Sequence, residues 1–118
     1  MEGQVDLQTG VKYDAGKPRM DLVSPYALEE MAKVMTIGAK KYGDHNWRKG
    51  LLWSRVFGAL LRHGYAYWRG ENTDPETGLS HLAHVMCCAM FLLEYSQTHI
   101  ELDDRYKSEN KTNDKLAF

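Results

Sequence analysis

The sequence lacks the features that mark membrane, secreted or general nucleic-acid-binding proteins. No apolar run reaches membrane-spanning length and the N-terminus shows no signal-peptide pattern, so we expect a cytoplasmic protein with no membrane partner. The net charge is only −1, which makes nucleic acid an unlikely partner by composition. Internal repeats and low-complexity tracts are absent, and 118 residues suit one small domain.

Cysteine is also scarce, which excludes a disulfide framework. The two cysteines, Cys87 and Cys88, are adjacent in an apolar segment. This placement predicts small buried thiols rather than a disulfide or a metal-binding pair. The histidines and cysteines do not follow a zinc-finger spacing either.

Two apolar segments with helical spacing dominate what is present. Residues 53–70 and 79–95 each repeat apolar side chains every three or four positions. The acidic stretch between them contains Asp74-Pro75 and Gly78, which are strong turn signals. The pattern predicts an αα-hairpin and an all-α helical bundle.

The remaining chain divides into an arm, one more helix and a tail. Ser24-Pro25 predicts a helix start and Tyr42-Gly43 its end. Residues 10–23 have no helical period and are expected to form an extended arm. We expect a flexible segment over residues 1–9, one nucleotide-binding domain over 10–106, with the last helix continuing to Tyr106, and a polar tail over 107–118.

The last predicted helix is apolar nearly all round between Val85 and Leu93. A helix without a polar face is expected to be buried on all sides. So short a chain offers few surfaces to cover it, so we predict a homo-oligomer, from a dimer to a hexamer.

Folding the hairpin at its turn brings three histidines and two carboxylates to one end: His63, His81, His84, Glu71 and Asp74. His81 and His84 share a helix face, since they are three residues apart. Imidazoles are common ligands for Mn, Fe, Ni and Zn, whereas Mg prefers oxygen. The cluster therefore fits a metal site, but direct contacts to phosphate or base and a purely structural role are alternatives.

Basic and aromatic residues elsewhere suit a nucleotide. Lys12, Lys17 and Arg19 on the arm are suited to closing on phosphates, or belong to a solvated extension. Trp47 beside Asn46 is suited to clamping a base, or covers the core beneath a loop. Arg62 belongs to a basic stripe that holds phosphates or faces solvent or another subunit.

Three segments together resemble a known family. They are GVKYDAGKPRMDL, IGAKKYGDHNW and RVFGALLRHGYAYWRGENTDPETGLSHLAH. The combination resembles the phage dATP/dGTP diphosphohydrolase N-terminal domain, over roughly residues 10–106. Lys41, in the second segment, is a further candidate for nucleotide binding.

That domain is similar in turn to the all-α MazG-like pyrophosphohydrolases. The resemblance implies a divalent metal (Mn or Mg), a purine nucleotide and cleavage of dATP or dGTP to the monophosphate and pyrophosphate. MazG-like enzymes use the motifs EExxE and ExxD, whereas this chain has Arg62, His63 and Ala66, then His81 and His84, at those places. Glu71 and Asp74 are then the expected catalytic carboxylates and oxygen ligands, beside His63, His81 and His84.

Two other functions remain open at this stage. The missing carboxylates favour a non-catalytic binding protein that sequesters a nucleotide, such as a cyclic nucleotide immune signal of the host. A helical DNA-binding protein fits less well, because the chain is not basic and neither hairpin helix has a free polar face.

Overall fold

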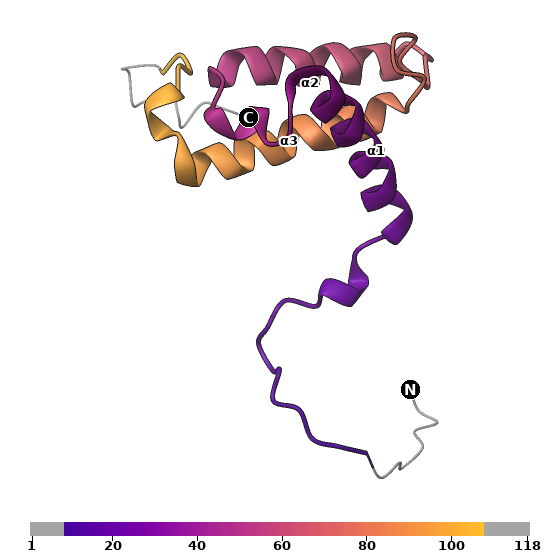
Figure 1. The fold of residues 1–118 in the computed structure, drawn as a ribbon, viewed down its shortest axis with the longest axis vertical. Coiled ribbons are helices and arrows are strands. Elements are labelled where there is room, and N and C mark those ends of the chain that lie inside the picture. Colours follow the sequence, from indigo (N-terminus) through magenta and orange to yellow (C-terminus); the bar gives the residue numbers. More distant parts are fainter. Residues whose placement is uncertain (1–8, 108–118) are drawn as a thin grey trace, which may run out of the picture.

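The computed structural model describes residues 9–107, and over this range it contains α-helices and short 3-10 helices but no β-strand (Figure 1). The predicted all-α class is therefore confirmed. Most of the expected flexible segment 1–9 and of the polar tail 107–118 lies outside the described residues.

Helix α1 spans Pro25–Tyr42 and begins and ends where the sequence predicts. The Ser24 hydroxyl accepts a hydrogen bond from the Ala27 amide at 3.1 Å, and Pro25 occupies the first helical position. At the other end, Gly43 has φ +97°, a conformation that glycine adopts without strain. None of the residues of α1 is fully buried, although the helix contacts α3.

Helices α2 (Trp53–Trp68) and α3 (His81–Thr98) form the predicted hairpin and make the most extensive contact in the structure (Figure 1). The connector between them is a structured loop. Thr73 and Ser80 pair as an antiparallel bridge, and the Asp74 amide donates to the Leu79 carbonyl at 2.8 Å. These bonds hold the loop closed over the end of the hairpin.

The core is small, and its main cluster lies at the end of the hairpin opposite the loop. Trp53, Val56 and Tyr95 are buried together, and Tyr95 is fully buried. The Tyr95 hydroxyl donates to the Trp47 carbonyl at 2.6 Å, which ties the 3-10 helix η2 (Asn46–Lys49) to α3. The Trp53 indole donates to the His99 carbonyl at 3.2 Å.

The predicted continuation of α3 to Tyr106 is wrong. The helix ends at Thr98, because His99 leaves helical geometry with φ −140° and ψ 55°. The His99 ring instead lies 2.8 Å from the Arg48 carbonyl, and the 3-10 helix η3 (Ile100–Leu102) follows. A tertiary contact with η2 therefore ends the helix.

Within one chain α3 is not buried on every side, as the prediction of a covering subunit allows. Leu93 is 74% exposed and Leu82 is 44% exposed. An apolar helix face thus lies at the surface of one copy, and the predicted homo-oligomer stays a prediction.

Residues 10–23 form the predicted arm, with a short 3-10 helix η1 (Met20–Leu22) before α1. Figure 1 shows the arm leading away from the helices. Within the described range, none of the helices is long and apolar enough to cross a membrane.

Candidate functional site

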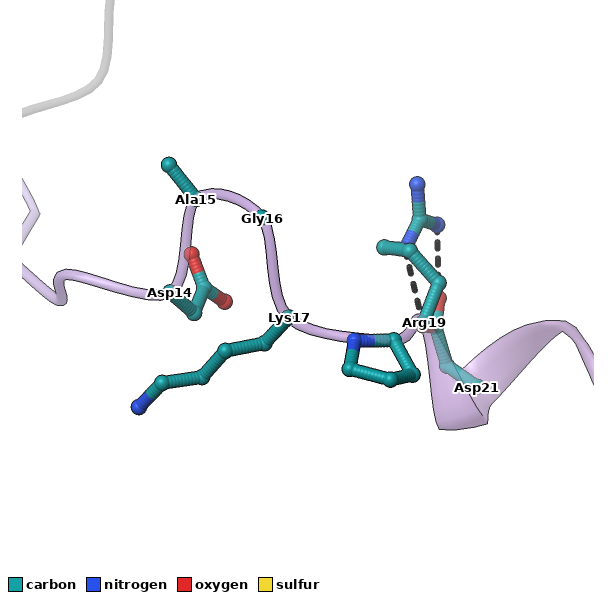
Figure 2. A pocket seen from close by; sticks show the side chains of 7 residues that line it. Asp14, Ala15, Gly16, Lys17, Arg19 and Asp21 are labelled. Atoms are coloured by element: carbon teal, nitrogen blue, oxygen red, sulfur yellow. Dashed lines mark hydrogen bonds and ion pairs between the residues drawn. The ribbon is translucent and has the colours of Figure 1, made fainter.

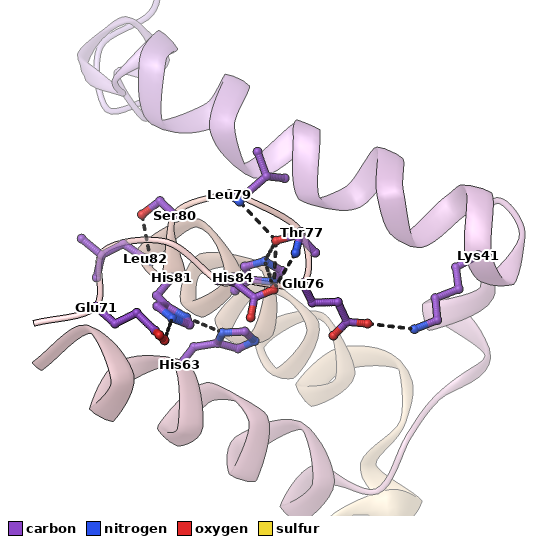
Figure 3. A network of polar contacts seen from close by, with 11 residues as sticks. Lys41, His63, Glu71, Glu76, Thr77, Leu79, Ser80, His81, Leu82 and His84 are labelled. Atoms are coloured by element: carbon purple, nitrogen blue, oxygen red, sulfur yellow. Dashed lines mark hydrogen bonds and ion pairs between the residues drawn. The ribbon is translucent and has the colours of Figure 1, made fainter. Parts of the chain in front are cut away.

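Figure 3 shows His63, Glu71, His81 and His84 together at the loop end of the hairpin. His63 lies on α2, His81 and His84 lie in the first turn of α3, and Glu71 and Asp74 lie on the loop. The structure brings all five together, as the hairpin geometry predicts. Their roles as ligands or catalytic groups stay predictions.

A chain of hydrogen bonds joins Glu71, His81 and His63. The Glu71 Oε1 atom lies 2.8 Å from His81 Nε2, and His81 Nδ1 lies 2.8 Å from His63 Nδ1. A carboxylate only accepts, so His81 Nε2 donates to Glu71. With neutral rings, the lone pair of His81 Nδ1 then accepts from His63 Nδ1, and His63 Nε2 keeps a free lone pair. This network assigns the tautomers, and it needs no charged imidazole.

A second network fixes Asp74. Its Oδ2 atom accepts from the backbone amide and the hydroxyl of Thr77, both at 3.0 Å. The Thr77 oxygen lies 2.8 Å from His84 Nε2 and 3.2 Å from the Leu79 amide. The hydroxyl proton goes to the carboxylate, so the Thr77 oxygen accepts from His84 and Leu79. Thr77 therefore orients Asp74, and His84 orients Thr77.

The sequence analysis missed Thr77. The spacing of Asp74 and Thr77, an acid three residues before a threonine beside Pro75 and Gly78, is the pattern of a side-chain-capped turn. That spacing is the signal that reveals its role.

The surroundings of His63, His84 and Asp74 favour two neutral imidazoles beside an ionised carboxylate. Burial and the neighbouring His84 lower the pKa of His63, and burial also lowers the pKa of His84. Burial acts to raise the pKa of Asp74, but the two hydrogen bonds from Thr77 outweigh it and lower that pKa. Near neutral pH this is the protonation state that a metal ion requires of its ligands.

Three of the five residues are placed to share one ion. His63, Asp74 and His81 each offer a ligand atom, and these atoms all lie within 4.8 Å of one another. Two imidazole nitrogens at right angles on a metal ion lie about 3.0 Å apart, for bonds of about 2.1 Å. The His63 and His81 Nδ1 atoms lie 2.8 Å apart, so they would need little spreading to meet that value. The His63 proton would have to move from Nδ1 to Nε2 before both atoms could bind one ion.

The other two residues support the first three. Glu71 holds the far nitrogen of His81, and His84 stacks on His63 with ring centroids 4.3 Å apart. Metal-binding histidines commonly donate their second nitrogen to a carboxylate in this way. Two nitrogens and one oxygen suit Mn, Fe or Zn better than Mg.

An apolar groove of about 960 Å³ begins at this cluster and runs between α1 and α3. His84 forms part of its wall, and Met31, Met35, Cys88 and Phe91 line it further along. The volume lies within the range of small-molecule sites. Both cysteines lie along this wall as free thiols, and burial raises the pKa of Cys87 to about 12.

The predicted base-binding pair lies at the groove, but Trp47 has little free surface. Asn46 and Trp47 belong to the groove lining. The Trp47 ring stacks on Phe91 with centroids 4.6 Å apart, and the Arg48 guanidinium lies 4.6 Å from its centre. A base can stack on Trp47 only after Arg48 moves.

The predicted phosphate-binding residues are divided between two places. Lys41 pairs with Glu76 of the loop at 3.7 Å, and exposed Arg62 precedes His63 on α2. Lys12, Lys17 and Arg19 lie on the arm, which the chain does not bring to its own cluster (Figure 1). The Arg19 guanidinium is held by Asp21 through bonds of 2.8 and 2.7 Å, whereas Lys17 extends away from that pair (Figure 2).

Comparison with known proteins gives one family and one curated relative. Residues 8–105 match the family model described as dATP/dGTP diphosphohydrolase, N-terminal. A protein of Salmonella phage PMBT28 named dATP/dGTP diphosphohydrolase is 39% identical over 97 residues, covering 82% of this chain and 33% of the relative. The chain thus spans about a third of the length of that relative.

No solved structure gives a significant match. The resemblance to MazG-like enzymes therefore stays a prediction. The family model, by contrast, matches most of the chain, from the arm to the end of the helices. The chain belongs to the family of dATP/dGTP diphosphohydrolase N-terminal domains.

Proposed function

We propose that this domain binds a purine deoxynucleotide at a divalent-metal site and cleaves dATP or dGTP to the monophosphate and pyrophosphate. The observation that carries the proposal is the convergence of His63, Asp74 and His81 beside His84, which lines a groove of nucleotide size. The name of the phage relative supports the substrate class.

In this proposal His63, His81 and Asp74 hold the ion, with Mn favoured over Mg by the two imidazoles. The bound ion supplies positive charge that stabilises the negative charge growing on the phosphate oxygens. Glu71 fixes the ring of His81, and Thr77 fixes the carboxylate of Asp74. The site is thus held in place before the nucleotide arrives.

The reaction is a hydrolysis. A water oxygen forms a bond to the α-phosphorus, the bond to the bridging oxygen breaks, and pyrophosphate leaves. The water proton passes to a carboxylate, Asp74 or Glu71, which are the acidic groups of the cluster. Glu71 is about half exposed, so it can return that proton to solvent.

The purine enters the groove along α1 and α3, with Asn46 available for hydrogen bonds to its edge. Lys41 and Arg62 lie at the hairpin end, where they attract the phosphates. The exposed surfaces of the groove wall, rather than the covered face of Trp47, then contact the base.

The experiment is product analysis after incubation with dATP, dGTP and other nucleotides in Mn or Mg. We expect pyrophosphate and a deoxynucleoside monophosphate from the unmodified chain. His63→Gln and Asp74→Asn should lower turnover at least about 100-fold, since each removes a proposed ligand. Glu101→Gln, which removes a carboxylate paired with His99 far from the cluster, is the matched control. Equal turnover in all variants refutes the assignment.

A second candidate is a binding domain that sequesters a nucleotide without cleaving it. It is favoured because only Asp74 supplies a carboxylate to the three-residue cluster, fewer than a Mg-dependent enzyme uses. In the same experiment such a protein depletes one linear or cyclic nucleotide from solution and releases it intact on heating. Monophosphate formation excludes this candidate.

A further inference from the structure

The arm carries apolar side chains that the chain itself does not cover. Val11 is 77% exposed, Tyr13 88%, Met20 76% and Leu22 71%. The arm nevertheless has local order: the Lys17 amide donates to the Asp14 carbonyl at 3.1 Å, and η1 follows. An ordered segment with exposed apolar side chains is typical of an interaction surface.

The arm also carries lysines that pair with none of the acids that the structure describes. Among the described residues, Lys12 and Lys17 form no ion pair, while Arg19 is occupied by Asp21. Conversely, the loop beside the metal cluster is acidic, with Glu71 about half exposed and Glu76 77% exposed. Arm and loop are thus complementary in charge.

The groove between α1 and α3 lacks a cover as well. Helix α1 has no fully buried residue, and the groove opens along its apolar side. Binding sites for small molecules usually enclose most of the ligand surface. A nucleotide in this open groove needs one further element over it.

The junction between arm and helix directs the arm away from its own groove. Val23 has ψ 139° and Ser24 has ψ 118°, both extended. Ser24 precedes Pro25, which disfavours helical turns at Ser24, and its side chain caps α1. The arm therefore continues outward, as Figure 1 shows, rather than folding back.

We propose that two copies of this chain exchange arms, so that the arm of one copy covers the α1–α3 groove of the other and brings Lys12 and Lys17 to its phosphate site. The inference rests on the proposed function for the role of the lysines. The exchange itself rests on the uncovered arm, the uncovered groove and their charges. The nucleotide then lies between the groove floor and the partner's arm.

Complementation between two inactive variants tests the role of the lysines. One variant carries Lys12→Ala and Lys17→Ala with an intact cluster, and the other carries His63→Gln and Asp74→Asn with an intact arm. An equal mixture that pairs at random into dimers should restore about a quarter of the wild-type turnover. Half of these dimers contain one chain of each variant, and one of the two sites in each mixed dimer is complete. No restoration overturns the role of the lysines in the partner's site.

Cross-linking tests the exchange without relying on activity. In a background with Cys87→Ala and Cys88→Ala, a chain with Val11→Cys is mixed with a chain with Met35→Cys, which lies in the groove. A short bismaleimide should give a covalent dimer of the two chains. Phe57→Cys on α2 is the matched control, since this exposed residue lies outside the groove lining.

The two readouts separate the possible failures. If the covalent dimer forms but the protein releases no pyrophosphate, the exchange of arms is supported and the proposed hydrolysis is refuted. If Val11→Cys cross-links to Met35→Cys no more efficiently than to Phe57→Cys, the exchange is overturned, whatever the turnover. Circular dichroism of each variant confirms that the helices are intact.

Discussion

At the scale of single residues, Asp74 shows how a turn prepares a carboxylate for chemistry. Thr77 donates to it twice, and His84 and the Leu79 amide both hold the Thr77 oxygen. Each hydrogen bond in this network has one assigned donor and one assigned acceptor. The carboxylate is therefore fixed and ionised in the free protein, and needs little rearrangement to bind an ion.

Replacing Thr77 tests this network. Thr77→Val keeps the shape of the side chain but removes its oxygen, so Asp74 loses one donor and His84 loses its acceptor. We expect about 10- to 100-fold weaker Mn binding, measured by isothermal titration calorimetry. Thr77→Ser keeps the oxygen and should bind nearly as the wild type does. Equal affinity of the valine variant would show that the network does not position Asp74.

The two cysteines give a second prediction at this scale. Burial raises the pKa of Cys87 to about 12 and also raises the pKa of Cys88. The reactive thiolate is therefore almost absent at pH 8. We expect mass spectrometry to find no alkylation by iodoacetamide in the folded protein and two modified thiols in denaturant. Rapid alkylation of the native protein contradicts the burial of Cys87 and the partial burial of Cys88.

At the scale of elements, a glycine in a left-handed conformation helps to shape the loop. Gly78 has φ +73°, a left-handed conformation, and its amide donates to the Asp74 carbonyl at 2.7 Å. Gly78→Ala should lower the free energy of unfolding by about 1 kcal/mol. Gly38→Ala in α1, where an added Cβ meets nothing within 4 Å, should instead raise it by about 0.5 to 1 kcal/mol. Chemical denaturation measures the free energy of unfolding of both variants. If Gly78→Ala loses no more stability than Gly38→Ala, the loop geometry is contradicted.

His99 links two elements in a pH-dependent way. Hydrogen bonds to Glu101 and to the Arg48 carbonyl raise its pKa, since both partners accept and favour the doubly protonated ring. Because the pKa of His99 is higher in the folded state, its protonated ring stabilises the fold fully at pH values below the unfolded pKa of 6.5. This stabilisation is lost as the pH rises through the pKa of His99 in the folded state. The difference in melting temperature between wild type and His99→Gln should therefore be larger at pH 6 than at pH 9. An equal or opposite difference would show that His99 does not link η2 and η3 through its charge.

Elements were predicted well where a local signal decides them. Ser24-Pro25 and Gly43 bound α1 by capping chemistry, and the loop signals between residues 71 and 78 define the hairpin. The end of α3 was missed because apolar Ile100 continues the pattern, whereas the contact of His99 with Arg48 comes from a distant segment. The convergence of the three histidines followed from the hairpin alone, but Thr77 has no periodicity to reveal it.

At the scale of the whole molecule, one copy leaves much apolar surface uncovered. The core holds Trp53, Val56 and Tyr95, while the arm and the faces of α1 and α3 stay exposed. The sequence predicts an oligomer from the apolar α3. The spacing of apolar residues describes helices within one chain, so it cannot say where the arm lies. In the proposed exchange the arm lies against a second molecule, which local patterns do not encode.

The central claim is that His63, Asp74 and His81 form a divalent-metal site, and titration of Mn into the nucleotide-free protein tests it most directly. The account predicts one ion per chain for the wild type and for Glu101→Gln, with binding lost in His63→Gln and in Asp74→Asn. Absence of binding in the wild type, or equal binding in all four proteins, would contradict it.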